Sequence, residues 1–158
     1  MTGYNEMTAK CPHCLCDLDP IKGKPRSLDQ LRRFFAVLRS MYFHWPESAK
    51  FQPHGEEHLR KWVLCQAGHR RVVKTLTLPG ANNPGRLEAM QKFADELLDM
   101  GNRFGRWKGA TLAVYEAKSI AFDKLGQAEF NRLNDEVEAV YKAEADLDAE
   151  TLLTEQSA

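Results

Sequence analysis

One run of apolar residues at helical spacing constrains the fold of this 158-residue chain more than any other feature. Apolar side chains recur every three or four positions from Leu28 to Trp45, which places them on one face of a helix. Ser27 is a favourable N-cap, and Gln30 stands three residues later, as in a capping box. Pro46 cannot continue a helix. The sequence therefore predicts a helix over residues 27–45 with one apolar face to bury.

The rest of the chain switches between helical and strand-like patterns. Helical spacing predicts further helices at about 55–67, 87–100 and 127–145. β-branched residues alternate with polar ones at 70–78, and alternation within 111–122 predicts one strand or two short ones. Closely spaced glycines predict an irregular segment over 101–109.

Few strands among several helices predict an α+β fold, with about four helices packed on a small antiparallel sheet of two or three strands. We expect residues 1–25 to form a short Cys-rich leader resembling a zinc knuckle. Residues 26–146 would form a single α+β domain, and residues 147–158 an acidic C-terminal tail. A small sheet exposes an edge, and exposed edges favour association. A homodimer is therefore one expected assembly.

Composition excludes several protein classes. Hydrophobic residues make up 43% of the chain, enough for a folded core. No apolar run approaches the roughly 20 residues that a membrane-spanning helix needs. The start of the sequence lacks the basic and apolar regions of a secretion signal. We expect a cytoplasmic protein with no membrane partner, whose four cysteines stay reduced.

Three of the four cysteines fall within six residues and predict a metal site. A Cys-x-x-Cys turn can present two thiolates to one zinc ion. A second pair lies four residues apart at the end of a predicted helix, a spacing that favours one shared direction. We predict a structural zinc site, with His13 and Cys16 as competing ligands, formed by Cys11, Cys14, Cys65 and His69. Reduced thiols without metal are the main alternative, and a redox Cys-x-x-Cys motif is a weaker one because no strand-to-helix setting is evident.

Residues 54–58 (HGEEH) fit the His-x-x-Glu-His pattern of inverted zinc peptidases. In such an enzyme His54 and His58 would hold zinc while Glu57 activates a bound water. Pro53 and Gly55 place His54 at or before the start of the predicted helix. An acidic first turn that complements the helix dipole explains the segment better. We therefore predict no catalytic centre and no enzyme activity, and keep a zinc hydrolase as a minor hypothesis.

The net charge of zero hides a strong asymmetry. Residues 1–80 carry a charge of +6, whereas residues 119–158 carry −7. A basic half of this kind predicts an anionic partner such as nucleic acid, although two oppositely charged solvated faces would give the same totals. Aromatic rings beside cations can also stack on unpaired bases. The predicted nucleic-acid contacts are Arg26, Arg32, Arg33, Arg39, Lys61, Arg70, Arg71, Lys74, Arg106 and Trp107.

Residues 24–38 (KPRSLDQLRRFFAVL) resemble the opening of phage-encoded accessory recombination proteins of the Orf (NinB) type. They also resemble a related family of uncharacterised prophage proteins, in which a Phe-Phe-x-x-Leu helix ends in Trp. Residues 118–125 (KSIAFDKL) are similar to a Lys-Ser-Ile-x-Phe strand of that family, which an acidic helix follows. The likeness touches about half of the chain. The cysteine cluster departs from the Orf pattern.

The resemblance implies a dimeric α+β mediator of recombination that binds DNA and the host single-strand-binding protein. It implies DNA contacts for Arg26 and Arg32. Our first hypothesis is accordingly a phage-derived accessory protein that binds nucleic acid, single-stranded DNA first, or a partner in recombination or replication. The alternative is a protein-interaction module or inhibitor that uses its acidic C-terminal helix against a host protein.

Overall fold

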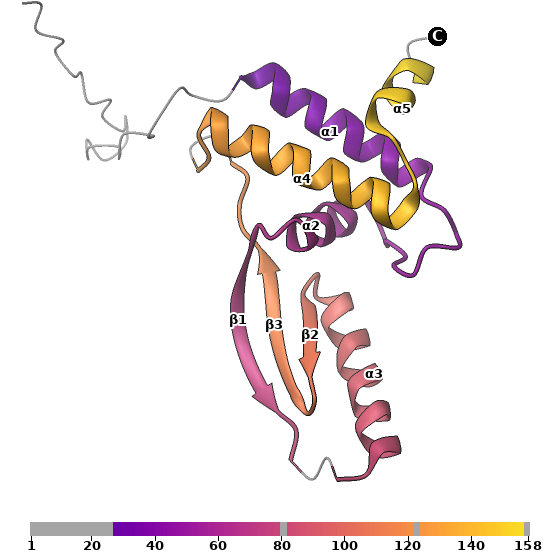
Figure 1. Ribbon diagram of the computed structural model, residues 1–158, viewed down its shortest axis with the longest axis vertical. Coiled ribbons are helices and arrows are strands. Elements are labelled where there is room, and N and C mark those ends of the chain that lie inside the picture. Colours follow the sequence, from indigo (N-terminus) through magenta and orange to yellow (C-terminus); the bar gives the residue numbers. More distant parts are fainter. Residues whose placement is uncertain (1–26, 80–81, 122–123, 157–158) are drawn as a thin grey trace, which may run out of the picture.

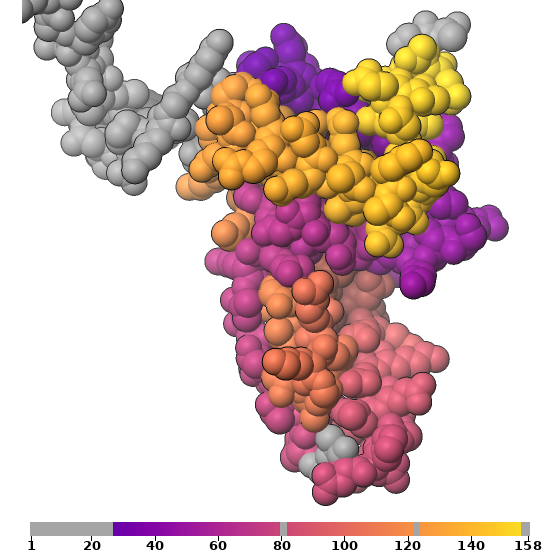
Figure 2. All heavy atoms as spheres, viewed as in Figure 1, coloured from indigo at the N-terminus to yellow at the C-terminus, as the bar shows by residue number. Residues whose placement is uncertain are grey.

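The computed structural model describes residues 27–79, 82–121 and 124–156 and has an α+β fold (Figure 1). The elements follow in the order α1 (Leu28–Phe43), α2 (Glu56–Gln66), β1 (Arg70–Thr77), α3 (Pro84–Met100), β2 (Phe104–Lys108), β3 (Thr111–Ala117), α4 (Gln127–Ala145) and α5 (Ala149–Gln156). They form two parts. We call α1, α2, α4 and α5 the helical body, and β1, α3, β2 and β3 the arm. Figure 2 shows the arm extending from one side of the helical body.

The main hydrophobic core lies inside the helical body. Its fully buried side chains come from the apolar face of each helix and include Met41, Leu59, Leu64 and Val137. Tyr141 is the largest of the fully buried side chains. These faces bury mainly one another, and the body covers the sheet only at one end, where Phe104 and Ala117 pack against the core.

The start of α1 is held to the start of α4 by polar contacts. The hydroxyl of Ser27 accepts the backbone N–H of Asp29 at 3.2 Å, as an N-cap should. Gln30 does not complete the predicted capping box, because its side chain contacts Asn131 and Gln127 on α4. Oε1 of Gln127 instead accepts the N–H of Ser27 at 3.0 Å. A residue 100 positions away thus supplies half of the cap.

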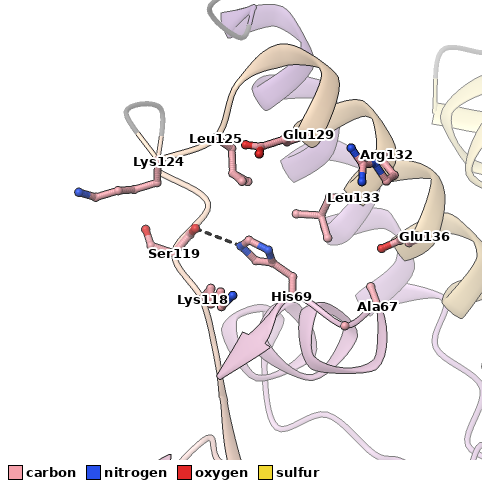
Figure 3. Close-up of a pocket in the computed structure, with 11 residues that line it drawn as sticks. Ala67, His69, Lys118, Ser119, Lys124, Leu125, Glu129, Arg132, Leu133 and Glu136 are labelled. Atoms are coloured by element: carbon pink, nitrogen blue, oxygen red, sulfur yellow. Dashed lines mark hydrogen bonds between the residues drawn. The ribbon is translucent and has the colours of Figure 1, made fainter. Parts of the chain in front are cut away.

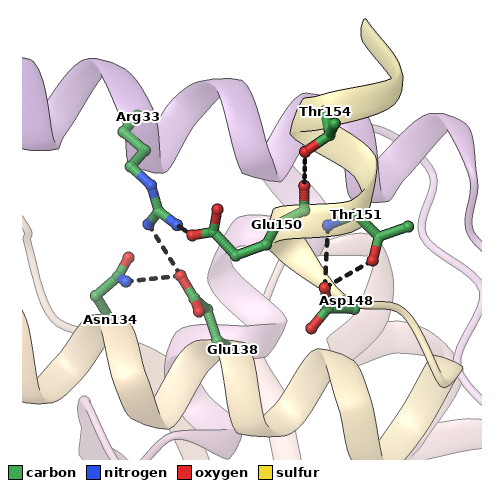
Figure 4. A network of polar contacts seen from close by, with 7 residues as sticks. All are labelled: Arg33, Asn134, Glu138, Asp148, Glu150, Thr151 and Thr154. Atoms are coloured by element: carbon green, nitrogen blue, oxygen red, sulfur yellow. Dashed lines mark hydrogen bonds and ion pairs between the residues drawn. The ribbon is translucent and has the colours of Figure 1, made fainter. Parts of the chain in front are cut away.

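The acidic end of the chain is structured. Residues 149–156 form α5, where the sequence predicted a tail, and Ala149 and Leu152 are buried in the core. Arg33 on α1 donates to Glu138 on α4 at 3.0 Å and also to Glu150 on α5 (Figure 4). One guanidinium therefore links three helices of the body.

The arm contains a three-stranded antiparallel sheet in the order β1-β3-β2. The register between β1 and β3 shifts between Val72 and Lys74, so Val73 occupies a β-bulge. β1 is an edge strand, and a bulge followed by a lysine is a common protection of such edges against pairing with another chain. The predicted edge is therefore present, but β1 is poorly suited to pair with a second copy.

Only α3 lies along the sheet. The indole Nε1 of Trp107 donates to Asp95 of α3 at 2.9 Å. Gly105 allows the close approach, since a Cβ at this position would lie 2.6 Å from Cδ1 of Leu112 and 3.0 Å from Cδ1 of Leu98. No residue of α3 is fully buried. The arm is thus held by a thin layer of contacts.

The predictions of an α+β fold and of an antiparallel sheet are confirmed, and the helices at 28–43, 56–66 and 127–145 lie where the apolar spacing placed them. The described ranges contain five helices, not four. Helices α1, α2, α4 and α5 pack mainly on one another instead of lying together on the sheet. The segment 101–109, predicted to be irregular, contains β2. The zinc-knuckle-like leader lies outside the described ranges.

No helix in the described parts of the chain is both long and apolar enough to cross a lipid bilayer.

Replacing Gly105 by Ala should loosen α3 from the sheet, because the added methyl group meets Leu112 and Leu98. We expect a loss of about 1–3 kcal/mol in the free energy of unfolding, typical of overpacking, measured by urea denaturation. Gly85→Ala is the matched control, since a Cβ at this position would lie an ordinary 3.6 Å from Oδ1 of Asn83. Equal stability of the two variants would contradict the close packing of α3.

Candidate nucleic-acid interface

The structure places most, but not all, of the residues predicted to bind nucleic acid or metal. Arg26, Cys11 and Cys14 lie outside the described ranges, and their predicted roles stay predictions. The remaining cations divide into two groups. Those of the first group are paired with carboxylates, and those of the second lie on the sheet without a carboxylate partner in the described ranges.

The cations of α1 belong to the first group. Arg33 is held by Glu138 and Glu150, as Figure 4 shows. Arg32 lies 3.3 Å from Asp29, and Arg39 lies 3.3 Å from Glu56. A phosphate would have to compete with these carboxylates. The predicted basic face of α1 is therefore largely neutralised.

Two further predicted contacts are also paired. Nζ of Lys61 lies 3.5 Å from Glu57, which Arg60 holds more tightly at 2.7 Å. Arg71 forms an ion pair with Glu116 across β1 and β3. Its hydrogen bond keeps the pKa of the Glu116 carboxyl below the ordinary value. Each carboxylate is shared by two cations, Glu57 by Arg60 and Lys61 and Glu116 by Arg71 and Arg103, so each site keeps one excess positive charge.

The two faces of the sheet differ in cover and in charge. Gly105 and Trp107 face α3, and alternation along β2 turns Arg106 and Lys108 the other way. On β3, Leu112 and Val114 are buried while their neighbours remain partly exposed. We call the face that carries Arg106, Lys108, Ala113 and Tyr115 the open face.

The open face carries cations and no acidic strand residue. Arg106 and Lys108 are exposed, and neither forms an ion pair within the described ranges. Arg70 lies across the sheet from Ala117, and its guanidinium carbon sits 4.4 Å from the ring centre of Tyr115. Thr75 and Thr77 add hydroxyl groups in the same register. Positive charge, an aromatic ring and hydroxyls suit a nucleic-acid strand.

Trp107 and Lys74 point to the face nearer α3. Trp107 is half-buried and bonded to Asp95, so its ring packs under α3 instead of forming an exposed platform. Lys74 is paired in register with the buried Val114. It is exposed, without an ion pair within the described parts of the chain. Of the predicted contacts, the open face therefore brings together Arg70 and Arg106.

Sequence reasoning missed Lys108 and Tyr115. The signal was present, because residues 105–108 (GRWK) alternate between a small or apolar residue and a cation. Strand alternation would have separated Arg106 from Trp107. Three glycines within nine residues suggested a loop and hid this pattern.

Cys65 and His69 are placed differently from each other. Cys65 is 1% exposed, and burial raises the pKa of its thiol to about 11, which disfavours the thiolate that zinc requires. Helix α2 ends at Gln66, and Gly68 adopts a φ of 84°, so helical spacing does not apply to His69. Zinc binding by Cys65 would require this side chain to leave the core. The predicted zinc site as a whole stays a prediction.

His54 and His58 converge on Asp99, which ends α3. Nε2 of His54 lies 2.6 Å from Oδ2 of Asp99, and Nε2 of His58 lies 2.8 Å from Oδ1. The second contact has the distance of an ion pair but not the direction of a hydrogen bond. Glu57, the base of the hydrolase hypothesis, binds Arg60 instead. The carboxylate of Asp99 thus joins the arm to the helical body.

These three residues are close enough to suggest a metal site. The imidazole rings of His54 and His58 are stacked, with centres 4.3 Å apart and planes 2° from parallel. A metal ion binds an imidazole nitrogen in the plane of the ring, and two parallel planes do not meet at one ion. Nδ1 of His58 also accepts the backbone N–H of His54 at 3.1 Å. The neutral ring therefore carries its proton on Nε2. This geometry fits a carboxylate shared by two imidazoles better than a metal centre.

Acid should destabilise the fold through His58. Burial lowers the pKa of this histidine below 6.5, although the charge of Asp99 opposes the shift. The unfolded chain then takes up a proton more readily than the folded one below that pH. The free energy of unfolding should fall as the pH drops through 6.5, measured by urea denaturation from about pH 8 to about pH 5.

A His58→Phe variant tests the source of this effect, because its ring can occupy the same space between Phe51 and Phe104 without titrating. We expect a shallower decline with acid in this variant. His44→Gln, an exposed replacement at the C-cap of α1, should keep the parent slope. Identical slopes for His58→Phe and the parent would exclude His58 as the source.

No protein-family model matches the chain, and no curated protein or solved structure matches it either.

Proposed function

We propose that this chain binds single-stranded nucleic acid, with single-stranded DNA as the first candidate, across the open face of the sheet. One observation carries the proposal. The open face presents Arg106 and Lys108 without carboxylate partners, whereas the cations of α1 are paired with carboxylates. Unpaired cations attract phosphate at no cost in broken ion pairs.

The arrangement suits a single strand better than a duplex. Arg106 and Lys108 lie two residues apart on one strand, roughly 6.7 Å along its axis, so they can contact successive phosphates of an extended chain. The ring of Tyr115 lies in the neighbouring strand, where an unpaired base can stack. A duplex would offer no unstacked base to this ring.

The resemblance to Orf-type proteins is the ground for placing this binding in phage recombination or replication. On that reading the chain is a cytoplasmic accessory protein with no catalytic centre of its own. The host single-strand-binding protein is then a candidate partner. The structural zinc site predicted at Cys11, Cys14, Cys65 and His69 stays a separate proposal.

The double variant Arg106→Gln/Lys108→Gln should bind a fluorescent oligothymidine more weakly than the parent. Loss of two phosphate contacts should reduce the slope of log K against log salt by about 1.4, given roughly 0.7 for each contact on a single strand. Fluorescence anisotropy over a range of low salt concentrations measures both quantities.

The matched control is Arg32→Gln/Arg39→Gln, which removes the same charge from α1. These cations are already paired, so we expect affinity and salt slope close to those of the parent. Equal losses in the two double variants would mean that net charge, and not the open face, drives binding. Absence of binding by the parent at every salt concentration would reject the proposal.

Self-association is a second candidate activity, favoured by an apolar stripe on the outer side of α3. Phe93, Leu97 and Met100 are 63%, 53% and 78% exposed and follow helical spacing. Lys92 and Glu96 border this stripe. This homodimer uses α3 and not the acidic C-terminal helix of the other hypothesis. Two carboxylates of that acidic region, Glu138 and Glu150, are engaged by Arg33.

Leu97→Ser should shift the sedimentation of a dimeric parent toward the monomer, because it removes the middle side chain of the stripe. Ala128→Ser on α4 is a control for an exposed substitution elsewhere. A parent that sediments as a monomer at about 100 µM would reject the α3 dimer, given the micromolar affinities of small interfaces.

A further inference from the structure

A pocket of about 730 Å³ lies between α4 and the end of the sheet from which β1 starts (Figure 3). His69 and Lys118 form one wall, just outside β1 and β3. Arg132 and Leu133 of α4 form the opposite wall. The backbone N–H of Lys118 donates to the carbonyl of His69 at 3.0 Å, so the first wall continues the sheet. The pocket thus adjoins the end of the sheet at which Arg70 lies.

The cations of this pocket are available to a ligand. Neither Lys118 nor Arg132 forms an ion pair within the described ranges. Arg132 belongs to α4, whose neighbouring Glu129 is turned back to accept the N–H of Gly126 at 3.4 Å. In Figure 3 the side chain of Lys124 points away from the pocket. Lys118 and Arg132 are therefore the two groups that could hold an anion from opposite walls.

His69 adds a hydrogen-bonding group of defined character. Its Nε2 lies 3.1 Å from the backbone carbonyl oxygen of Ser119, which can only accept. Nε2 therefore carries a proton, and in the neutral ring Nδ1 has the free lone pair. Contact with the carbonyl also fixes the orientation of the ring.

The remaining lining residues provide apolar surface or hydrogen-bond acceptors. Leu125 and Leu133 provide apolar surface, and Glu129 and Glu136 provide carboxylate oxygens. A ligand that fits must therefore combine an anionic group with a flat or apolar part that also carries donors. The volume lies within the range of small-molecule sites, about 300–1,000 Å³.

We propose that this pocket binds a nucleoside monophosphate unit, in particular the phosphorylated terminal nucleotide of a strand that lies on the open face. Lys118 and Arg132 hold the phosphate, the leucines contact the base, and the imidazole and carboxylates accept from amino or hydroxyl groups. The strand-end part of this assignment rests on the proposed function. Binding of the free nucleotide does not.

The first experiment titrates the full chain with AMP and follows the side-chain signals of the histidines and the backbone amides by NMR. We expect saturable shifts at His69, Lys118 and Arg132. Adenosine and inorganic phosphate should each bind at least tenfold more weakly than AMP, because each has only part of the complementary groups. Phosphate that binds as well as AMP would reduce the site to an unspecific anion site and overturn the proposal.

The variant Arg132→Gln should weaken AMP binding on the order of tenfold or more, the usual effect of losing a hydrogen bond to a charged group. Lys118→Gln should act in the same direction from the opposite wall. Arg86→Gln, an exposed arginine on α3, is the matched control and should bind AMP like the parent. Unchanged AMP affinity in both pocket variants would overturn the site.

The second experiment compares oligonucleotides with and without a 5′-phosphate or a 3′-phosphate. A terminal phosphate should raise affinity at least threefold for the parent and not for Arg132→Gln. If neither phosphate matters but AMP still binds, the ligand is a free nucleotide and not a strand end. If oligonucleotides do not bind at all but AMP does, the open-face proposal fails while the nucleotide pocket stands.

Discussion

The apolar faces of α1, α2, α4 and α5 bury one another, and the character of the sheet follows from that packing. A helix has one main apolar stripe to bury, and here most of that surface meets other helices. Only α3 lies along β2, while the body covers Phe104 and Ala117 at one end of the sheet. Arg106 and Lys108 on the open face remain exposed. The arm therefore combines an exposed strand surface with a helix that has no fully buried residue.

The helical body and the arm are joined by apolar packing and by one charged contact. Phe104 and Ala117 of the arm pack against the core of the body. Asp99 at the end of α3 contacts two histidines at the start of α2, one exposed and one 3% exposed. The ring of His58 also packs against Phe51 and Phe104, so the same residue belongs to an aromatic cluster and to a charged contact. Protonation of His58 should weaken the attachment of the arm to the body. A charged ring requires water, and water reaches this ring only if the aromatic cluster opens.

Strong periodic patterns were enough to predict most elements, and the failures have identifiable causes. The helix over 28–43 carries uninterrupted spacing, and the strand over 70–77 keeps its strand-like pattern on both sides of the bulge at Val73, so local sequence and tertiary packing agree. β2 was missed because Gly105 looks like a loop residue, whereas its role is to let α3 approach the sheet. Helix α5 was missed because its acidic residues mask Ala149 and Leu152, the two that reach the core.

Candidate site residues were harder to predict than elements, for two physical reasons. The charge of a side chain can be read from sequence, but its partner cannot: Glu138 lies 105 positions from Arg33. Motif spacing likewise says which residues are near one another and not how their rings are oriented. Residues 54–58 bring two histidines together, as the hydrolase pattern requires, yet they stack in parallel beside Asp99. A shared metal ion would need the planes of the two rings to intersect at the ion. Residues 54–58 therefore match the hydrolase pattern in sequence without the ring geometry that zinc binding requires.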